Sequence, residues 1–599
     1  MVLCSINTSY RQTFSSYDWT IKEKNNFYAL VGFELYNKQY QQTYMQNRYF
    51  PKDITAERAW DNMGLGTAYQ STSEKSTADR TTSYFAQLNY NYDHKYLLSG
   101  TFRADGSSLF APGNQWGYFP SVSGAWVISE EAFLKDVTWV NEVKFRAAIG
   151  KAGNNRIDSD QWRFLYYSNN TSGPAFGENL VDGELWMDTG SNLVNPNLKW
   201  ETTLTRNFAF DLSFFNNRLR INPEYYWNTT SDLIYRADVL SVNGYAKQYQ
   251  NIGQVTNRGW ELSVSGDILR GKDYVLSANF NIGANKMKVD KLTGDEDYIE
   301  IRHSRANSSA GNNYRLQVGG EVGLIYGYVW DGLYSFDEFK AEGYGYTPWD
   351  GKMVDNEGNV RPATVDMDGI FDSNRAGNAT LPGKPKFKDL NGDGKIDEND
   401  RTVIGRTTPK FQGGFGLNGQ WKNFDFVANF TYFLDFDVYN ATAYYLSSSI
   451  GNTSGNYYNV FSKFTNRWNY TLGAENTYKN EQYDDGALHK FYATEQNAGK
   501  TQWNPADLRK DYTVSNFVED GSFLRCTDIT LGYSLPSNII KHAGMSKCRF
   551  YASVTNPFII TSYSGFDPEV DVQSGLTPSY DFNRYPRSRS YVLGINLSF

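Results

Sequence analysis

The last eleven residues, Arg589 to Phe599 (RSYVLGINLSF), decide the fold class. Large apolar side chains alternate there with small or polar ones, the large ones being Tyr591, Leu593, Ile595, Leu597 and Phe599. A period of two is typical of a β-strand with one apolar face. The strand runs to the terminal residue, so something must cover that face, and lipid is one candidate.

The overall composition favours sheet over helix. Aromatic residues make up 16% of the 599 residues, led by 45 tyrosines and 38 phenylalanines, and aromatic side chains are enriched in strands. The mean hydropathy is −0.59, and no run of about 18 apolar residues predicts a membrane-spanning helix. A transmembrane barrel remains compatible with this composition, because its strands alternate and average to polar.

Charge, cysteines and the first residues narrow the function classes. A net charge of −8 argues against nucleic acid as a partner. The three cysteines, Cys4, Cys526 and Cys548, are too few for a disulfide framework. Single buried thiols are the favoured interpretation, although the last two could lie on neighbouring strands. Met1 to Cys4 do not resemble a signal peptide, so either the protein stays inside the cell or the chain is a fragment.

The chain repeats one unit, an alternating strand followed by a break. About fifteen strands are expected, and together they predict an all-β, antiparallel protein. The expected strands are Ser5–Phe14, Asn26–Asn37, Thr81–Tyr92, Lys95–Asp105, Trp116–Ser129, Glu142–Ala152, Lys199–Phe215, Arg218–Thr229, Asn251–Asp267, Asp273–Lys286, Lys410–Trp421, Phe424–Asp437, Ser522–Leu535, Lys547–Asn556 and Arg589–Phe599. The clearest helical candidate is short, Tyr457–Trp468.

Short and long breaks alternate along the chain. The short ones carry turn residues, and the long ones follow Asn37 and Gly153 and fill 287–409 and 439–521. Outer-membrane barrels have this sidedness, with short periplasmic turns and long extracellular loops. Segment 287–409 is therefore expected outside the cell, and the terminal strand is expected to run towards the periplasm.

Single strands also have two distinct faces. Phe208, Phe210, Leu212 and Phe214 share one face of their strand, and Ala209, Asp211 and Ser213 share the other. Lipid outside and a polar lumen inside fit this pattern. A strand of a soluble sandwich predicts the same alternation, so the sidedness of the loops carries more weight than any one strand.

Residues 389–400 (DLNGDGKIDEND) have the spacing of a calcium-binding loop. Calcium takes six to eight oxygen ligands from such a loop, which places a glycine at position 6. The expected ligands are Asp389, Asn391, Asp393, Lys395 through its carbonyl, Asp397 and Asp400. Asp400 stands where a bidentate glutamate is usual, as in dockerin-type loops. The alternative is a turn rich in Asp, Asn and Gly that binds no metal.

No catalytic arrangement is found in the sequence. The four histidines, His94, His303, His489 and His542, are scattered and form no metal-binding motif. The carboxylate pairs Asp484-Asp485 and Asp366-Met367-Asp368 are expected by chance among 66 acidic residues. We therefore expect a protein that is not an enzyme.

Aromatic residues in the long loops are candidates for ligand contacts. Trp330, Trp349, Trp468 and Trp503 could stack on sugar rings or hold a peptide. Packing of the loops against one another, or against a partner protein, is the favoured alternative for any single residue.

Several motifs resemble the SusC/RagA family of TonB-dependent outer-membrane transporters. The resemblance runs from about residue 20 to the C-terminus. It is carried by NPNLKWET (195–202), NIGQVTNRGWEL (251–262), RADGSS (103–108), VEDGSFLR (518–525), LGYSLP (531–536) and GFDPEV (565–570).

The resemblance implies an importer of oligosaccharides or oligopeptides in the outer membrane of a Gram-negative, Bacteroidota-type bacterium. Such a transporter is a 22-stranded barrel filled by a plug, capped by a SusD-like surface lipoprotein and energised by TonB, ExbB and ExbD. The chain is expected to be the C-terminal barrel portion, without plug, TonB box or the first strands. The alternative is a secreted or surface all-β binding or adhesion protein with a calcium-stabilised loop.

The terminal strand then has a specific expectation. In a closed barrel it would pair with a first strand that this chain is expected to lack. We therefore expect Arg589 to Phe599 to have one unpaired edge, where unsatisfied backbone groups are costly in lipid.

Overall fold

The structure is a computed structural model of the chain. It describes residues 2–599 except 77, 165–166, 169–186, 189–191, 241, 243, 293–296, 305, 307–311, 334–343, 347–352, 356–359, 362–382, 384, 393–395, 449–459, 469–496, 498, 504, 506–511 and 571–574. The chain divides into two compact units. Unit 1 comprises Met1–Gly266 and Met287–Asp295, and unit 2 comprises Asp267–Lys286 and Glu296–Phe599.

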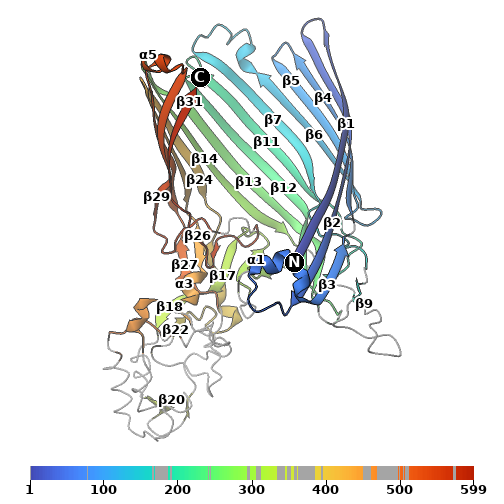
Figure 1. Cartoon of the computed structure of the whole chain (residues 1–599), viewed down its shortest axis with the longest axis vertical. Coiled ribbons are helices and arrows are strands. Elements are labelled where there is room, and N and C mark those ends of the chain that lie inside the picture. The colour runs from blue at the N-terminus through green and yellow to red at the C-terminus, as the bar shows by residue number, and fades with distance from the viewer. Residues whose placement is uncertain are drawn as a thin grey trace. The chain divides into compact units, whose positions relative to one another are not determined.

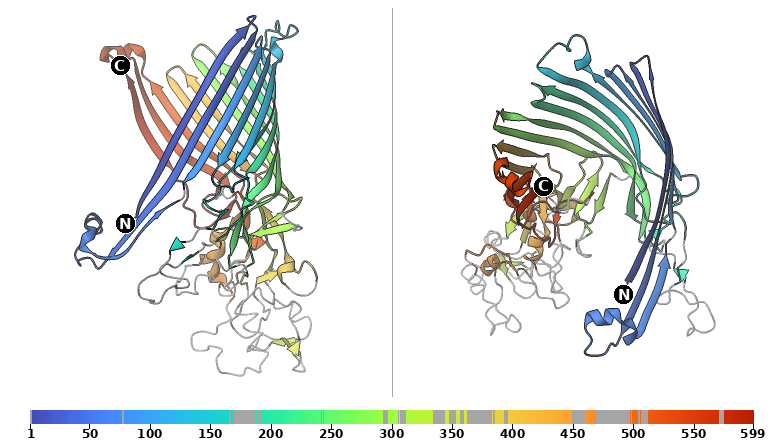
Figure 2. Two further views of the ribbon diagram at one scale, coloured as in Figure 1. Left: turned by 90° about the vertical axis from the view of Figure 1, so that its right-hand side faces the viewer. Right: turned by 45° about the horizontal axis from the view of Figure 1, so that its top comes forward.

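Unit 1 is built on one curved antiparallel sheet of long, tilted strands (Figures 1 and 2). Its strands pair in the order β1-β2-β4-β5-β6-β7-β11-β12-β13. The strands are β1 (Val2–Ile21), β2 (Asn25–Arg48), β4 (Asp79–Tyr92), β5 (Tyr96–Ser107), β6 (Trp116–Val127), β7 (Val140–Asn154), β11 (Glu201–Phe214), β12 (Leu219–Asp238) and β13 (Lys247–Arg270).

Short elements accompany this sheet. β3 (Thr67–Lys75) pairs with the distal end of β2, and β10 (Asn192–Leu193) pairs in parallel with β13. The others are β8 (Tyr167–Ser168), β9 (Met187–Asp188), helix α1 (Ala56–Asp61) and the 3-10 turns η1 (Met63–Leu65) and η2 (Ile128–Glu130).

β1 and β2 form a hairpin that is much longer than a membrane crossing requires. All 20 residues of β1 pair with β2, from Ile21 opposite Asn25 to Val2 opposite Tyr44. Lys22, Glu23 and Lys24 connect Ile21 to Asn25, and Lys22 and Glu23 have φ values of 51° and 59°, which suit a short hairpin turn. A strand crosses a bilayer in about 9–11 residues, so roughly half of this hairpin extends beyond the membrane.

Unit 2 contains a second run of antiparallel strands, paired in the order β14-β24-β25-β28-β29-β31. These are β14 (Tyr274–Lys291, whose last residues belong to unit 1), β24 (Phe411–Trp421), β25 (Phe424–Leu434), β28 (Phe523–Ser534), β29 (Lys547–Thr561) and β31 (Ser590–Ser598).

The long segments of unit 2 contain small sheets. β15 (Tyr298–Ile301), β16 (Tyr314–Gln317), β17 (Leu324–Tyr328) and β23 (Arg401–Arg406) form one of them. β27 (Val518–Asp520), β26 (Asp437–Asn440) and β30 (Tyr580–Asp581) form another. The remaining strands are β18 (Trp330–Leu333) with β22 (Pro385–Phe387), and β19 (Tyr344–Tyr346) with β20 (Met353–Asp355) and β21 (Val360–Arg361).

Helical structure is limited to short pieces in the described part of unit 2. These are α3 (Ala441–Tyr445), α5 (Ser537–Ile540), η4 (Glu398–Asp400), η6 (Ser462–Asn466), η9 (Ser515–Phe517) and η10 (Lys541–Ala543). Within the described ranges of the whole chain, no helix is long and apolar enough to span a membrane.

All fifteen expected strands are present. The structure corrects their lengths, because β2 continues beyond Asn37 to Arg48, β12 beyond Thr229 to Asp238 and β29 beyond Asn556 to Thr561. The stretch after Asn37 is therefore partly strand rather than a loop. The expected helix at Tyr457–Trp468 is only the 3-10 turn η6 among its described residues. Gln, Asn and Lys side chains interrupt the apolar pattern in the distal half of β2, so periodicity did not reveal it.

The short turns have the backbone that their sequences predict. Asp93 and His94 have φ values of 50° and 59°, Asn216 and Asn217 have 60° and 63°, and Lys422 has 51°. Left-handed residues match the twist of the flanking strands, and Asn and Asp tolerate this conformation best.

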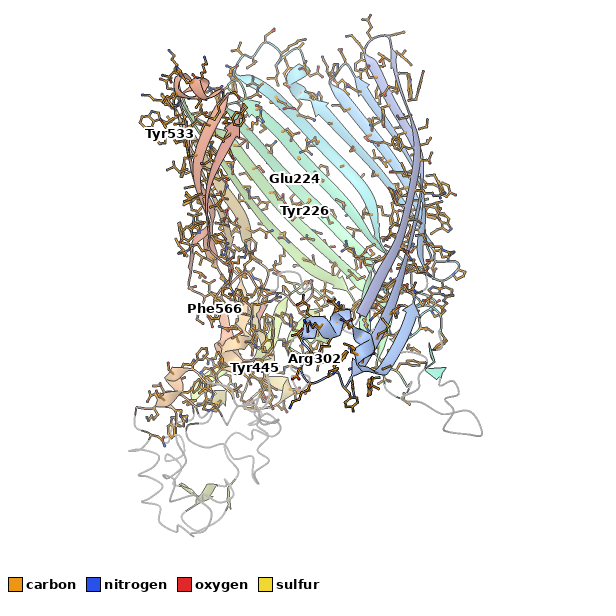
Figure 3. The ribbon with its side chains drawn as sticks, viewed as in Figure 1. Glu224, Tyr226, Arg302, Tyr445, Tyr533 and Phe566 are labelled. Atoms are coloured by element: carbon orange, nitrogen blue, oxygen red, sulfur yellow. The ribbon has the colours of Figure 1, made fainter. Side chains whose placement is uncertain are left out.

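The two faces of the sheet in unit 1 differ as expected. Phe208 and Phe210 are 49% and 41% exposed, whereas Ala209 and Ser213 between and beyond them are buried. Glu224 and Tyr226 project from the opposite, polar face of β12 and are labelled in Figure 3. The aromatic face is the lipid-facing surface of a barrel wall, and the polar face is its lumen side.

The edges of the described strands confirm the expectation for the terminal strand. β31 pairs with β29 through nine residues, from Ser590 opposite Thr555 to Ser598 opposite Lys547. No other described strand pairs with it, and likewise β1 pairs with β2 alone among the described strands of unit 1. Each of these two strands therefore has one edge of unpaired backbone groups.

Candidate functional site

The polar face of unit 1 carries arginine–carboxylate networks. Arg103 of β5 donates through Nε to Asp105 (2.7 Å) and through Nη2 to the Ser83 hydroxyl (2.9 Å). The same guanidinium lies 3.6 Å from Glu34 of β2. Three neighbouring strands therefore share one charged cluster, and its carboxylates compensate the arginine.

A second network lies on β7, β11 and β12. Arg146 donates to both carboxylate oxygens of Asp211, at 2.8 and 2.9 Å. Asn222 donates to the same carboxylate at 3.1 Å, and Asn207 donates to Glu224. Bidentate pairing fixes the plane of the guanidinium against the sheet.

A hollow of about 430 Å³ opens between these strands. Asn26, Asn89, Ser99, Ser123, Arg146 and Asn207 contribute its polar lining. Amides, hydroxyls and one guanidinium offer hydrogen bonds to a hydrated solute. The face can therefore line an aqueous passage, as the lumen side of a barrel does.

Unit 2 repeats this arrangement on a smaller scale. Arg549 of β29 donates through Nε to Asp425 of β25 at 2.8 Å, and its Nη2 makes a second contact with the same carboxylate. Phe424 and Phe550, next to them in sequence, are exposed on the opposite face.

The two motifs NPNLKWET and NIGQVTNRGWEL meet in unit 1. The side chain of Asn251 accepts a hydrogen bond from the backbone N–H of Lys199 (3.0 Å) and donates to the carbonyl of the same residue (2.9 Å). It also donates to the carbonyl of Asp232 (2.8 Å). We call this contact the amide junction.

Two further residues of these motifs complete the amide junction. Trp200 packs in a buried cluster with Phe110, Phe119 and Leu198, and its indole donates to the Gln115 carbonyl at 2.9 Å. Gly253 has φ +57°, and a Cβ placed on it would lie 1.8 Å from the carbonyl oxygen of Lys291. Only glycine permits this backbone conformation at so close an approach.

The motifs VEDGSFLR and GFDPEV meet in unit 2. Arg525 donates through Nη2 to Asp567 (2.6 Å), and its Nε lies 3.6 Å from Glu569. Arg587 reaches the same two carboxylates from the segment before β31, at 3.8 Å from Asp567 and 2.5 Å from Glu569. The Arg525 side chain is 5% exposed and that of Asp567 is 10% exposed. We call this contact the ion-pair junction.

Two buried titratable groups, the Tyr563 phenol and the Asp581 carboxyl, lie near the ion-pair junction. The Tyr563 hydroxyl donates to Asp581 at 2.6 Å. Burial raises the pKa of the Asp581 carboxyl, and the hydrogen bond from Tyr563 partly opposes this rise. Burial and the Asp581 charge raise the pKa of Tyr563. The carboxylate is therefore held in a site that favours its protonated form more than water does.

The calcium-loop residues lie only partly within the described chain. Asp393 and Lys395 are outside it. Asp400 is fully buried and accepts hydrogen bonds from the backbone N–H groups of Leu390 and Asp397, each at 2.8 Å. Asp389 accepts from the N–H of Gly392 at 2.6 Å. Among the described residues, no three His, Cys, Asp or Glu side chains are grouped to hold a metal.

Three of the four candidate tryptophans pack among the loops. The rings of Trp330 and Trp503 lie 5.1 Å apart, and Trp503 also contacts Phe464 at 5.1 Å. Trp503 and Trp468 are 3% and 9% exposed, and Trp349 lies outside the described residues. These three side chains therefore pack against other loop residues, which is the alternative that the sequence favoured.

Cys526 and Cys548 are free and buried. They lie on the neighbouring strands β28 and β29, but Cys526 is opposite Phe558, whereas Cys548 lies at the other end of β29, opposite Leu597 of β31. Cys526 and Cys548 are therefore two separate buried thiols.

Known proteins with this β-barrel architecture match the chain in sequence and in fold. The model of the family described as "TonB dependent receptor-like, beta-barrel" matches residues 5–352. The chain belongs to this family.

The receptor-family chain is similar to several characterised relatives. TonB-dependent receptor P39 of Formosa agariphila is 29% identical over 610 residues, covering 99% of this chain and 53% of the relative. TonB-dependent receptor SusC of Bacteroides thetaiotaomicron is 31% identical over 529 residues, covering 88% and 44%. The RagAB peptide importer in its closed-closed state matches the fold with a TM-score of 0.74 at 22% identity, covering 100% of this chain and 56% of the solved one.

These matches place the receptor-family chain in the outer membrane as a β-barrel protein. They are receptors and transporters, so the family is not one of enzymes. The chain spans about half the length of the relatives it matches.

Sequence reasoning missed the residues that join the motifs. Asn251, Arg525 and Asp567 were parts of recognised motifs, but nothing in their spacing showed that NPNLKWET contacts NIGQVTNRGWEL or that Arg525 faces Asp567. The arginine between Leu524 and Cys526 and the Asp567-Pro568 step were the available signals.

Proposed function

We propose that the chain forms the wall of a SusC/RagA-type transporter that imports oligosaccharides or oligopeptides across the outer membrane. The observation that carries the proposal is the two-faced sheet of unit 1. Its aromatic face suits lipid, and its polar face holds paired charges and a hollow of about 430 Å³. A passage for hydrated solutes needs this division.

The relatives support the partners that this transporter needs. The similar solved structure is described as the RagAB peptide importer. We propose a SusD-like surface lipoprotein as the corresponding partner here, and TonB, ExbB and ExbD as the energy source, acting through a plug-bearing part outside this chain. The relatives are named TonB-dependent receptors, which supports TonB as the energy source.

Gene deletion tests the import proposal. The deletion strain and its complemented parent are grown on separate oligosaccharides and oligopeptides as the limiting nutrient. We expect a growth defect on one substrate class, and the same defect when TonB is deleted. Equal growth of both strains on every oligosaccharide and oligopeptide would show that import is not the function. Affinity purification from detergent-solubilised membranes should recover a surface lipoprotein with the wild-type protein.

The unpaired edges of β1 and β31 support a larger barrel. We propose that further strands of the same protein pair with these edges, because exposed strand edges do not occur in lipid. Intact-mass measurement of the native protein tests this idea. We expect a mass well above the 68.3 kDa of this chain, and a mass of 68.3 kDa would contradict it.

The calcium loop remains a proposal drawn from its sequence. Asp400 accepts hydrogen bonds from the backbone N–H groups of Leu390 and Asp397, so it links the described residues near the two ends of this stretch. We expect calorimetry on the intact protein to detect calcium binding that Asp393→Ala abolishes. Binding that survives this substitution, or no binding by the wild type, would show a metal-free turn. Extracellular loops of this kind bind calcium at about 10⁻⁴ to 10⁻³ M.

A further inference from the structure

Two arginines lie on the aromatic, lipid-facing side of unit 1. Arg206 of β11 is directly opposite Trp227 of β12, and Trp227 is directly opposite Arg258 of β13. The three side chains therefore form one row across three neighbouring strands. We call it the Arg-Trp-Arg row.

The neighbours of this row identify its face. Phe208, Phe210, Tyr225 and Trp260 lie two or four residues along the same strands and are 49%, 41%, 46% and 41% exposed. Alternate residues of a strand share a face. The row is therefore part of the apolar surface, where unpaired charges are unfavourable near the membrane centre.

The two guanidinium groups share the indole instead of a carboxylate. The guanidinium carbons of Arg206 and Arg258 each lie 4.5 Å from the centre of the Trp227 ring, which is a cation–π distance. Within the described residues, neither arginine forms an ion pair, and Arg206 also donates through Nη1 to the Thr229 hydroxyl at 3.4 Å. Asp290, on β14, is held by Gln254 and Thr256 further along β13.

Arginines on the polar face behave differently. Arg103 and Arg146 both lie against carboxylates at 2.7 to 2.9 Å. The Arg-Trp-Arg row thus keeps two positive charges available on the opposite face, and no described side chain neutralises them. A binding partner of this surface should be anionic.

The depth of the row selects the partner. Trp227 lies eight residues from Leu219, the first residue of β12, and Arg206 lies eight residues before Phe214, the last residue of β11. These ends adjoin the short turns. With a rise of about 3.4 Å per residue and a tilt of about 40°, the row lies roughly 20 Å above them. The apolar band of such barrels is about 25 Å tall, so the row lies near its outer boundary.

We propose that the Arg-Trp-Arg row binds the phosphate group of a lipid in the outer leaflet. Each guanidinium offers paired N–H donors that match phosphate oxygens. Both guanidinium carbons lie 4.5 Å from one ring centre, so the two cations belong to one cluster that an anionic headgroup can approach. Trp227, 38% exposed, packs against the apolar part of the lipid. This lipid site is independent of the substrate that the transporter imports.

Native mass spectrometry of the protein purified from outer membranes tests the proposal. The probes are phosphorylated lipid A, dephosphorylated lipid A and inorganic phosphate. The variants are Arg206→Gln with Arg258→Gln, and the charge-preserving pair Arg206→Lys with Arg258→Lys. A matched control, Lys22→Gln with Lys272→Gln, removes two charges from short turns elsewhere.

We expect the affinity for phosphorylated lipid A to fall about tenfold or more in the glutamine pair, as loss of charge-assisted hydrogen bonds implies. The lysine pair should bind more tightly than the glutamine pair but less tightly than the wild type, because lysine keeps the charge and loses the paired donors. The control pair should match the wild type. Dephosphorylated lipid A and inorganic phosphate should bind weakly to all four proteins.

Two results would overturn the proposal. One is equal binding of phosphorylated lipid A by the glutamine pair and the wild type, and the other is equal binding of both forms of lipid A by the wild type. If inorganic phosphate alone binds as tightly as the lipid, the row is an anion site and not a lipid site. Should the glutamine pair fail to fold, the comparison of the two lipids on the wild type and on Arg258→Gln decides the question.

Discussion

The amide junction and the ion-pair junction both hold distant parts of the chain together, but they use different chemistry. Each joins two sequence motifs that are distant along the chain. At the amide junction, Asn251 binds the backbone of Lys199 and Asp232 without any charge. At the ion-pair junction, Arg525 is buried against Asp567 and Glu569. The first depends on backbone position, and the second on charge balance.

This difference in chemistry predicts how strongly a single substitution at each junction destabilises its unit. Neutral hydrogen bonds contribute about 0.5–1.5 kcal/mol each, whereas removing one partner of a buried ion pair costs about 3–5 kcal/mol. Unit 2 should therefore be more sensitive to a single substitution at its junction than unit 1. The stability of unit 2 should also change with pH, because burial raises the pKa of the Asp581 carboxyl near its junction.

The largest effect is expected from Arg525→Met. It leaves Asp567 and Glu569 buried with only Arg587, which is 46% exposed, so we expect a loss of about 3–5 kcal/mol. Thermal unfolding of the detergent-purified native protein, followed by heat-dependent gel mobility, measures it. Arg587→Met is the matched control and should cost less. An unchanged unfolding temperature for Arg525→Met would show that the ion pair does not stabilise unit 2.

Gly253→Ala should be the most disruptive change at the amide junction. The left-handed backbone costs a non-glycine residue about 1–2 kcal/mol, and the new Cβ would lie 1.8 Å from the Lys291 carbonyl oxygen. Gly244→Ala is the control, since Gly244 has φ +76° but nothing within 4 Å of a Cβ. The same unfolding measurement should show a larger loss for Gly253→Ala. Equal losses would mean that the close approach is not important.

Asn251→Ala removes the amide itself. Three hydrogen bonds to backbone groups are lost, and we expect a cost of about 1–3 kcal/mol. Asn195→Ala, which removes a single donated bond to the Tyr249 carbonyl and one accepted bond from Asn197, should cost less. If Asn251→Ala destabilises as much as Arg525→Met, the contrast between the junctions is wrong.

The smallest expected effect is a pH dependence at Asp581. Burial raises its pKa, so ionisation costs stability. That cost is absent below the unfolded-state pKa of about 3.9 and complete above the raised folded-state pKa. Asp581→Asn removes it, and the stability of the variant relative to the wild type should increase as pH rises from 4 to 7. A constant difference across this range would contradict the expectation.

The sequence predicted the strands well because their signal is local. Alternation within Thr81–Tyr92 or Trp116–Ser129 records one apolar face against lipid, and each turn carries its own Asn, Asp or Lys-Asn signature. Both faces of β11 were assigned correctly from seven residues. Such patterns need no knowledge of distant parts of the chain.

The junctions and the loop packing could not be predicted in this way. Arg525 and Asp567 are separated by 42 residues, and Trp330 and Trp503 meet across 173 residues of sequence. Such contacts depend on tertiary structure, which periodicity does not encode. The distal half of β2 was missed for a related reason. Gln39, Gln41 and Gln42 interrupt the apolar pattern on both faces, so no continuous apolar face marks this part as a strand.

The long β1–β2 hairpin has a consequence outside the membrane. Residues 38–48 of β2 continue the hairpin well past the roughly ten residues that cross a bilayer, and they pair with both β1 and β3. With the short turns on the periplasmic side, as expected for an outer-membrane barrel, we expect this segment to project at the cell surface. An antibody raised against residues 38–48 should label intact cells, and a phage or a protease should meet this segment before it reaches the barrel wall.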